Sequence, residues 1–220
     1  MKQFEYILFD LDGTVTDPKT GITKSIAYAL EHFGITVEDL DEVTKCIGPP
    51  LKESFMQYYG FNELEADRAI AKYREYFGTT GLYENAVYAG MEHLLKTLAD
   101  RDKTLMIATS KPTVYAVKIL EHFGLMRYFQ FISGSELDGT RTKKSEVIAH
   151  ALEQNAVTDL SGVVMVGDRK HDILGAKEIG IASVGVLYGY GSLSELQNSG
   201  ADFIAEGVGD LHRFFMGGRL

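Results

Sequence analysis

Two aspartates near the start of the chain have the types and spacing most suited to chemistry. Asp10 and Asp12 follow the apolar run 7–9 and precede Gly13. Residues two apart on a strand point to the same side, so both carboxylates should face one spot past the strand's carboxyl end, where open α/β sheets bind ligands. Two such charges require a cation, and Mg²⁺ takes oxygen ligands. The alternative is a plain turn, because Asp and Gly both favour turns.

Three further positions carry groups that complement this pair. They are Thr109 and Ser110 after the run 104–108, Lys143 and Lys144 at the start of a helical pattern, and Asp168 with Asp172 after the run 163–166. Gathered at one sheet edge, they offer acids, hydroxyls and a cation. Phosphoryl transfer needs such a set, because its transition state spreads negative charge over three oxygens. Taken singly, each has a simpler explanation: a helix cap, a solvated surface lysine or a helix-dipole contact.

The elements that must position these groups are short apolar runs alternating with helical patterns. Predicted strands cover 6–9, 104–108, 129–132 and 163–166, with weaker candidates at 183–187 and 202–205. Helical spacing marks 91–98, 114–123, 147–152 and 173–179. Continuous apolar strands suit a parallel sheet covered on both faces, and the alternation predicts a doubly wound α/β domain.

Residues 16–84 interrupt that alternation. They contain no convincing strand and instead show amphipathic patterns over 22–33, 51–59 and 66–77. We therefore expect an inserted all-helical domain at 16–84 within an α/β core domain formed by 1–15 and 85–220. The segments near Asp17-Pro18 and 84–90 are candidate hinges.

Bulk composition narrows the possible function classes. The chain has 220 residues, is 45% hydrophobic and carries a net charge of −9. Such acidity disfavours a nucleic-acid partner. The single cysteine, Cys46, rules out an intrachain disulfide and a cysteine-rich metal site, and no base is evident that would make it a nucleophile. No signal-peptide pattern and no long apolar run is seen, so a cytoplasmic protein without a membrane partner is the default expectation.

These motifs resemble those of the haloacid dehalogenase-like (HAD) superfamily across essentially the whole chain. Within it the resemblance is closest to small bacterial phosphatases of the phosphoglycolate phosphatase and 5'-nucleotidase-like groups. The resemblance implies that Asp10 is the nucleophile and that Asp12 is the general acid/base, whose backbone carbonyl also ligates Mg²⁺. It also implies that Thr109 binds phosphoryl oxygens. Ser110 stands where relatives often carry asparagine.

The same resemblance assigns the remaining site residues. Asp168 becomes a Mg²⁺ ligand together with Asp10 and Asp12, and Asp172 and Gly13 support the site. The family lysine matches Lys144 better than Lys143, although Lys143 stays open.

Residues 16–84 resemble the family's helical cap, which closes over the substrate and excludes water. Its specificity segment would lie near 45–50, which makes Lys45 a candidate contact to an anionic substrate. Lys24 and Lys52 are further candidates, with solvated helix-face lysines as the alternative. His171 is expected to face solvent, and Tyr188 and Tyr190 receive no role.

Together these features predict a Mg²⁺-dependent phosphatase. It would hydrolyse a small phosphomonoester (phosphoglycolate, a nucleoside monophosphate or a sugar phosphate) through an aspartyl-phosphate. A sugar-phosphate mutase on the same fold is the close alternative. A phospho-receiver domain would not carry its phosphoacceptor on the first strand, a dehalogenase would not need Asp12, and a non-catalytic binding protein would not need the full set. The oligomeric state stays open.

Overall fold

The computed structural model describes residues 4–217 and divides the chain into two compact units. The first unit runs up to Asp17 and resumes at Val87, and the second is Pro18–Ala86. The second unit is therefore an insertion between two parts of the first.

A six-stranded sheet forms the centre of the first unit, in the order β5-β4-β1-β6-β7-β8. Its strands are β1 (Tyr6–Phe9), β4 (Thr104–Pro112), β5 (Phe131–Ser135), β6 (Val163–Gly167), β7 (Ala182–Val186) and β8 (Phe203–Ala205). Every neighbouring pair is parallel. Because β1 lies between β4 and β6, the carboxyl ends of these three strands meet at one edge.

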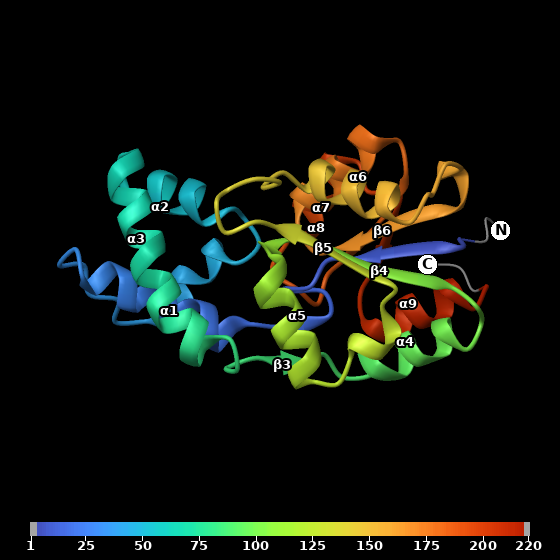
Figure 1. Ribbon diagram of the computed structural model, residues 1–220, viewed down its shortest axis with the longest axis horizontal. Helices are drawn as coiled ribbons and strands as arrows, with labels where there is room; N and C mark the ends of the chain where they lie inside the picture. Colours follow the sequence, from blue (N-terminus) through green and yellow to red (C-terminus); the bar gives the residue numbers. More distant parts are fainter. Residues whose placement is uncertain (1–3, 218–220) are drawn as a thin grey trace. The chain divides into compact units, whose positions relative to one another are not determined.

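Helices cover the sheet on both faces, as Figure 1 shows. One face carries α6 (Lys144–Gln154), α7 (Lys170–Ile179) and α8 (Leu193–Ser199), and the other carries α4 (Met91–Ala99), α5 (Thr113–His122) and α9 (Val208–Phe215). The short helices Met126–Tyr128 and Leu160–Gly162 precede β5 and β6. The expected doubly wound parallel α/β architecture is confirmed.

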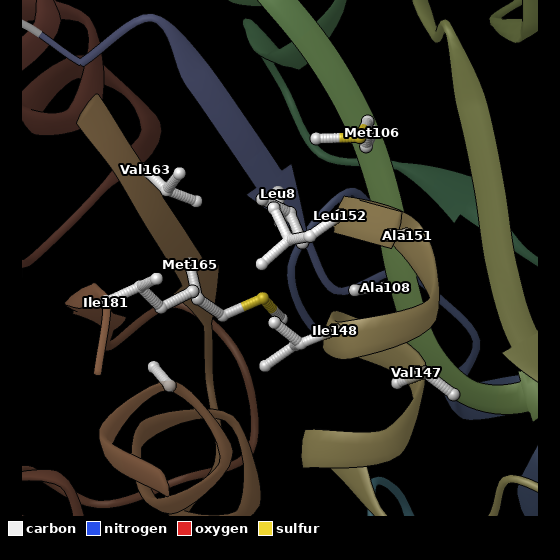
Figure 2. Close-up of a cluster of buried hydrophobic side chains, with 11 residues drawn as sticks. Leu8, Met106, Ala108, Val147, Ile148, Ala151, Leu152, Val163, Met165 and Ile181 are labelled. Atoms are coloured by element: carbon white, nitrogen blue, oxygen red, sulfur yellow. The ribbon is translucent and has the colours of Figure 1, made fainter. Parts of the chain in front are cut away.

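The core explains why the central strands are apolar without interruption. Ile7, Leu8 and Phe9 of β1 are fully buried, because helices cover both of its faces. Figure 2 shows the cluster under α6, in which Leu8 packs with Met106 and Ile148. This packing anchors the strand ends and the start of α6 in one rigid frame.

Two strands differ from the sequence prediction by more than one residue at an end. β5 begins at Phe131 rather than at residue 129, and β4 continues to Pro112 instead of ending at residue 108. The extension of β4 is irregular: its pairing with β5 shifts register between Ala108 and Pro112. Such irregularities re-aim side chains and are frequent next to active sites.

The second unit is helical. It contains α1 (Lys19–Glu31), the 3₁₀ segment η1 (Leu40–Cys46), α2 (Leu51–Tyr59), α3 (Glu63–Tyr76) and the π-helical turn η2 (Phe77–Gly81). Its core includes Ile26, Leu30 and Phe55. A tight approach fixes α1 against η2, because a Cβ at Gly21 would lie 1.9 Å from the Gly81 carbonyl oxygen.

A short two-stranded sheet lies where the chain passes between the units. It pairs β2 (Thr16–Asp17) with β3 (Ala86–Val87). The expectation of no strand from residue 16 to 84 was therefore wrong at its first two residues, since two residues are too short to show alternation. Within residues 4–217, no helix is both long and apolar enough to span a membrane.

Candidate active site

Asp10 stands directly after β1, at the shared carboxyl edge of the three central strands. Its backbone N–H donates to the Val166 carbonyl at 2.9 Å, so β6 fixes the residue's backbone. Its own Oδ1 accepts a hydrogen bond from Leu11 N–H at 2.7 Å. The side chain is buried, and the sheet therefore holds one carboxylate at a defined position.

Lys144 joins Asp10 to Asp172. Its Nζ lies 2.9 Å from Asp10 Oδ1 and 2.7 Å from Asp172 Oδ1, and it donates to the Ala108 carbonyl at 3.1 Å. Burial lowers the pKa of Lys144, but the two carboxylates outweigh burial and raise it above the usual value. The structure thus places Lys144 in the site, whereas its neighbour Lys143 is exposed.

Asp168 follows β6 and is completely buried. Its Oδ2 accepts a hydrogen bond from Tyr190 N–H at 2.7 Å, and the Thr14 hydroxyl lies 3.5 Å from Oδ1. The predicted Gly13 is required here for space, because a Cβ at this residue would lie 2.3 Å from Asp168 Oδ2. Gly13 also has a φ of 81°, which favours glycine.

Asp10, Asp168 and Asp172 form a group that could hold a metal ion. One oxygen from each lies within 4.8 Å of the others, and all three residues are buried. Burial, followed by the charges of Asp172 and Asp10, raises the pKa of Asp168 well above its usual value. Burial likewise raises the pKa of Asp172 to about 6, although Lys144 opposes this shift.

Three close, buried carboxylates, of which two share Lys144 as a partner, fit a hard divalent cation, since Mg²⁺ prefers oxygen ligands. Asp12, expected as a third ligand with Asp10 and Asp168, is not in this group. The Asp12 side chain has a different partner, described below, and Asp172 is the third member of the group. The Asp12 backbone carbonyl stays a predicted ligand.

Asp12 pairs with Lys111, a residue that the sequence analysis overlooked. Lys111 Nζ lies 2.8 Å from Asp12 Oδ2, and the two side chains are only 5% and 11% exposed. Burial raises the pKa of Asp12, and Lys111 opposes that rise. The one available signal was that Lys111 follows Thr109-Ser110, two residues beyond a predicted site residue.

The irregular end of β4 presents Thr109 and Lys111 together. Thr109 is buried, and its hydroxyl oxygen accepts a hydrogen bond from Lys111 N–H at 3.3 Å. Ser110, which lies between them, accepts at its backbone carbonyl from the Ser135 hydroxyl at 2.8 Å. Thr109 and Ser110, which the sequence predicted, and Lys111, which it did not, therefore lie on one irregular segment beside β1.

A loop that the sequence analysis left without a role packs against Asp168. The Tyr188 hydroxyl donates to the Thr14 carbonyl at 3.0 Å, and the Tyr190 hydroxyl bonds to Asp17. A Cβ at Gly191 would lie 1.9 Å from the Asp168 carbonyl oxygen. Glycines at 189 and 191 let this backbone approach Asp168 closely. The Tyr-Gly-Tyr-Gly pattern was therefore the sequence signal that could have indicated a role for this loop at the site.

The predicted lysines of the second unit have partners inside that unit. Lys24 Nζ lies 2.5 Å from a Glu84 oxygen, and Lys52 Nζ lies 3.0 Å from Asp67 Oδ1. Lys45 is exposed, with its Nζ 4.9 Å from the ring centroid of Tyr58. Of the three candidates, Lys45 alone has no acidic partner among those described.

His171, expected to face solvent, is half-buried, and its pKa is lowered by burial and then by the charges of Lys170 and Arg169. Cys46 is a buried thiol in the helical unit.

A family model described as haloacid dehalogenase-like hydrolase matches residues 7–186. The chain belongs to this family. The match includes Asp10, Asp12, Lys144 and Asp168.

Several known proteins are closely similar to this chain. A 5'-nucleotidase of Pseudomonas aeruginosa is 51% identical over 195 residues, which are 89% of this chain and 88% of that protein. The tyrosine-protein kinase PtkA of Mycobacterium tuberculosis is 41% identical over 187 residues, or 85% of this chain and 63% of the kinase. A crystal structure of a predicted phosphatase from Clostridium acetobutylicum has a TM-score of 0.95 and 48% identity, and the match covers 98% of this chain and 99% of that one. The chain is therefore a hydrolase of a family whose phosphatases share its fold.

Proposed function

We propose that this protein is a Mg²⁺-dependent phosphatase that cleaves a small phosphomonoester through an aspartyl-phosphate. The observation that carries the proposal is the different pairing of two carboxylates at one strand end. Asp10 contacts Lys144 through Oδ1 at 2.9 Å, and Asp12 contacts Lys111 through Oδ2 at 2.8 Å. Because the two carboxylates have separate lysine partners, Asp10 can serve in the attack on phosphorus and Asp12 in proton transfer.

In the first half-reaction, Asp10 attacks the phosphorus. Its contacts with Leu11 N–H and Lys144 both use Oδ1, which directs Oδ2 to form the new bond to phosphorus. As the bond between phosphorus and the leaving oxygen breaks, protonated Asp12 gives its proton to that oxygen. Burial of Asp12 favours the protonated form that this step needs.

In the second half-reaction, water releases the phosphate. Asp12, now a carboxylate, takes a proton from water while the water oxygen attacks phosphorus and the bond to Asp10 breaks. Lys144 and the Thr109 hydroxyl would offset charge on the phosphoryl oxygens. Asp10, Asp168 and Asp172 would hold Mg²⁺, with the Asp12 carbonyl as a further ligand. Bound Mg²⁺ would supply charge neutralisation between the phosphate and the attacking carboxylate.

The decisive variant is Asp10→Asn. It should abolish Mg²⁺-dependent release of phosphate from p-nitrophenyl phosphate and leave the circular dichroism spectrum unchanged, because the amide is a poor nucleophile of nearly the same size. Full activity in a folded Asp10→Asn protein would refute the assignment.

For the substrate, the similarity to a 5'-nucleotidase makes nucleoside monophosphates the first compounds to test. Phosphoglycolate and sugar phosphates should be screened beside them for release of inorganic phosphate. A product that is an isomerised sugar phosphate, without free phosphate, would instead indicate a mutase. Transfer of phosphate from ATP to a tyrosine substrate would match the kinase relative.

We further propose that Pro18–Ala86 acts as a cap that selects the substrate, with Lys45 as a contact to its anionic end. Support comes from the helical fold of this unit and from the exposure of Lys45. A substrate profile that stays unchanged in Lys45→Ala would argue against this role.

A further inference from the structure

The ion pair between Lys111 and Asp12 is almost completely buried. A buried lysine requires a partner, because removing a charge from water is strongly unfavourable. Lys111 finds that partner at 2.8 Å in the residue expected to transfer protons, and not in the metal-binding group. The pairing with Asp12 therefore accounts for the burial of Lys111, which is not a solvated surface lysine.

The two oxygens of Asp12 are in different situations. Oδ2 faces Lys111 Nζ, whereas Oδ1 is buried and has no hydrogen-bond partner among the described residues. A buried acceptor without a partner is unfavourable unless a ligand satisfies it. Of the two oxygens, Oδ1 is therefore the one with capacity for a further hydrogen bond or a proton.

We propose that Lys111 is a positioning residue that clamps Asp12 Oδ2 and thereby reserves Oδ1 for proton exchange with the leaving oxygen and, later, with water. The proposal rests on the proposed phosphatase function. It adds a residue that acts through Asp12 rather than on the substrate.

The irregular end of β4 explains how Lys111 reaches this position. The register shift between Ala108 and Pro112 lets Thr109 and Lys111 share one buried segment, and Lys111 N–H is held by the Thr109 hydroxyl oxygen at 3.3 Å. Pro112 is the N-cap residue of α5 and limits the freedom of the segment. The lysine is thus anchored at its backbone and paired at its head group.

A test can use leaving groups of different quality. Phenyl phosphate and p-nitrophenyl phosphate are similar in size, but phenol leaves less easily and so depends more on a placed proton. Lys111→Met should lower kcat/KM for phenyl phosphate about 10-fold more than for p-nitrophenyl phosphate, within the usual range of general-acid effects. Lys111→Arg should restore part of this difference, because arginine keeps a donor and a charge.

Two controls make the result specific. Lys118→Met changes an exposed lysine on the next helix and should alter neither substrate's kcat/KM. In an Asp12→Asn background, Lys111→Met should cause no additional leaving-group-dependent loss, because the group that it positions no longer carries a proton to give. If Lys111→Met does not fold, Lys111→Gln takes its place.

The outcomes separate this proposal from the phosphatase assignment. Equal losses for both substrates, no loss at all, or a further selective loss in the Asp12→Asn background would overturn the role of Lys111 while leaving the phosphatase intact. No phosphate release by the wild-type protein from either compound would overturn both. A selective loss with rescue by arginine would support the positioning role.

Discussion

The sheet edge of the first unit and the inserted unit place their lysines in opposite environments. At the sheet edge of the first unit, the side chains of Lys111 and Lys144 are 5% and 3% exposed and are paired with carboxylates. In the inserted unit, Lys24 also pairs with a carboxylate, yet its side chain is 41% exposed. The same residue types therefore form a buried network at the sheet edge and solvated surface pairs in the inserted unit.

The difference shows which charges are tied to the reaction. Exposed pairs contribute little, because water screens them and competes for both partners. Buried pairs need every member, because losing one partner leaves an uncompensated charge away from water. A buried lysine is thus a stronger sign of chemistry than an exposed one, even where both face an acid.

The largest effect on stability and activity is expected from removing the buried charge of Lys144. Lys144→Met should destabilise the protein by about 3–5 kcal/mol, because Asp10 and Asp172 lose their shared partner. It should also lower kcat by about 10²–10³-fold through lost charge stabilisation. Urea unfolding and phosphate release would measure the two effects.

Lys143→Met is the matched control, since Lys143 is the exposed neighbour in sequence. Its stability should change by no more than about 0.5 kcal/mol. Similar losses in both variants would show that burial does not separate the two lysines.

Addition of Mg²⁺ should sharpen the comparison by acting on one unit alone. Binding at Asp10, Asp168 and Asp172 should stabilise the protein by about 2.7 kcal/mol when the free ion is 100 times its dissociation constant. Hydrogen exchange should slow around Leu11 and Tyr190, with far less effect inside residues 18–86. The Asp168→Asn variant should lose the effect, and protection confined to the inserted unit would contradict the assigned site.

EDTA should abolish activity, and added Mg²⁺ should restore it.

A packing change tests the inserted unit by a route that involves no charge. Gly21→Ala should destabilise it by about 1–3 kcal/mol, because the new Cβ would meet the Gly81 carbonyl oxygen at 1.9 Å. Gly209→Ala, whose Cβ would have open space around it, should be neutral or slightly stabilising. Equal thermal midpoints for the two variants would mean that the α1–η2 approach is not tightly packed.

The smallest effect is expected at Lys45. Lys45→Met should change stability by about 0.5 kcal/mol, the scale of an exposed cation–π contact with Tyr58. Hydrolysis of p-nitrophenyl phosphate should stay near the wild-type rate, because this compound has no anionic tail to bind. A large loss of folding stability would show that Lys45 has a structural role and is not simply a solvated surface lysine.

The sequence was sufficient for the central architecture. The run 6–9 is β1 in the structure, because a strand buried on both faces must be apolar at every residue. The placement of Asp10 at its carboxyl end followed from the same pattern. Lys144 could be preferred over Lys143 only through family resemblance, since the two adjacent lysines look alike in a pattern of charges.

What could not be predicted depends on contacts far apart in the chain. Lys111 precedes a proline and a helix, where a lysine is ordinarily exposed, and its burial requires Asp12 from the segment after β1. Tyr190 meets Asp168 only after the sheet has formed. The η1 and η2 segments were also missed, because 3₁₀ and π turns lack the 3.6-residue period on which the helix predictions depend.

The contact between the two ends of the inserted unit has a consequence for the order of folding. Gly21 N–H donates to the Glu84 carbonyl at 2.9 Å, so this unit brings its own ends together. β1 must later pair with β4, as Tyr6 does with Thr104, across the whole insertion. If the insertion folds first, it shortens the loop to be closed and lowers the entropic barrier to that pairing by about 1 kcal/mol. The insertion would then hold the central strands of its host within reach of each other before the sheet exists.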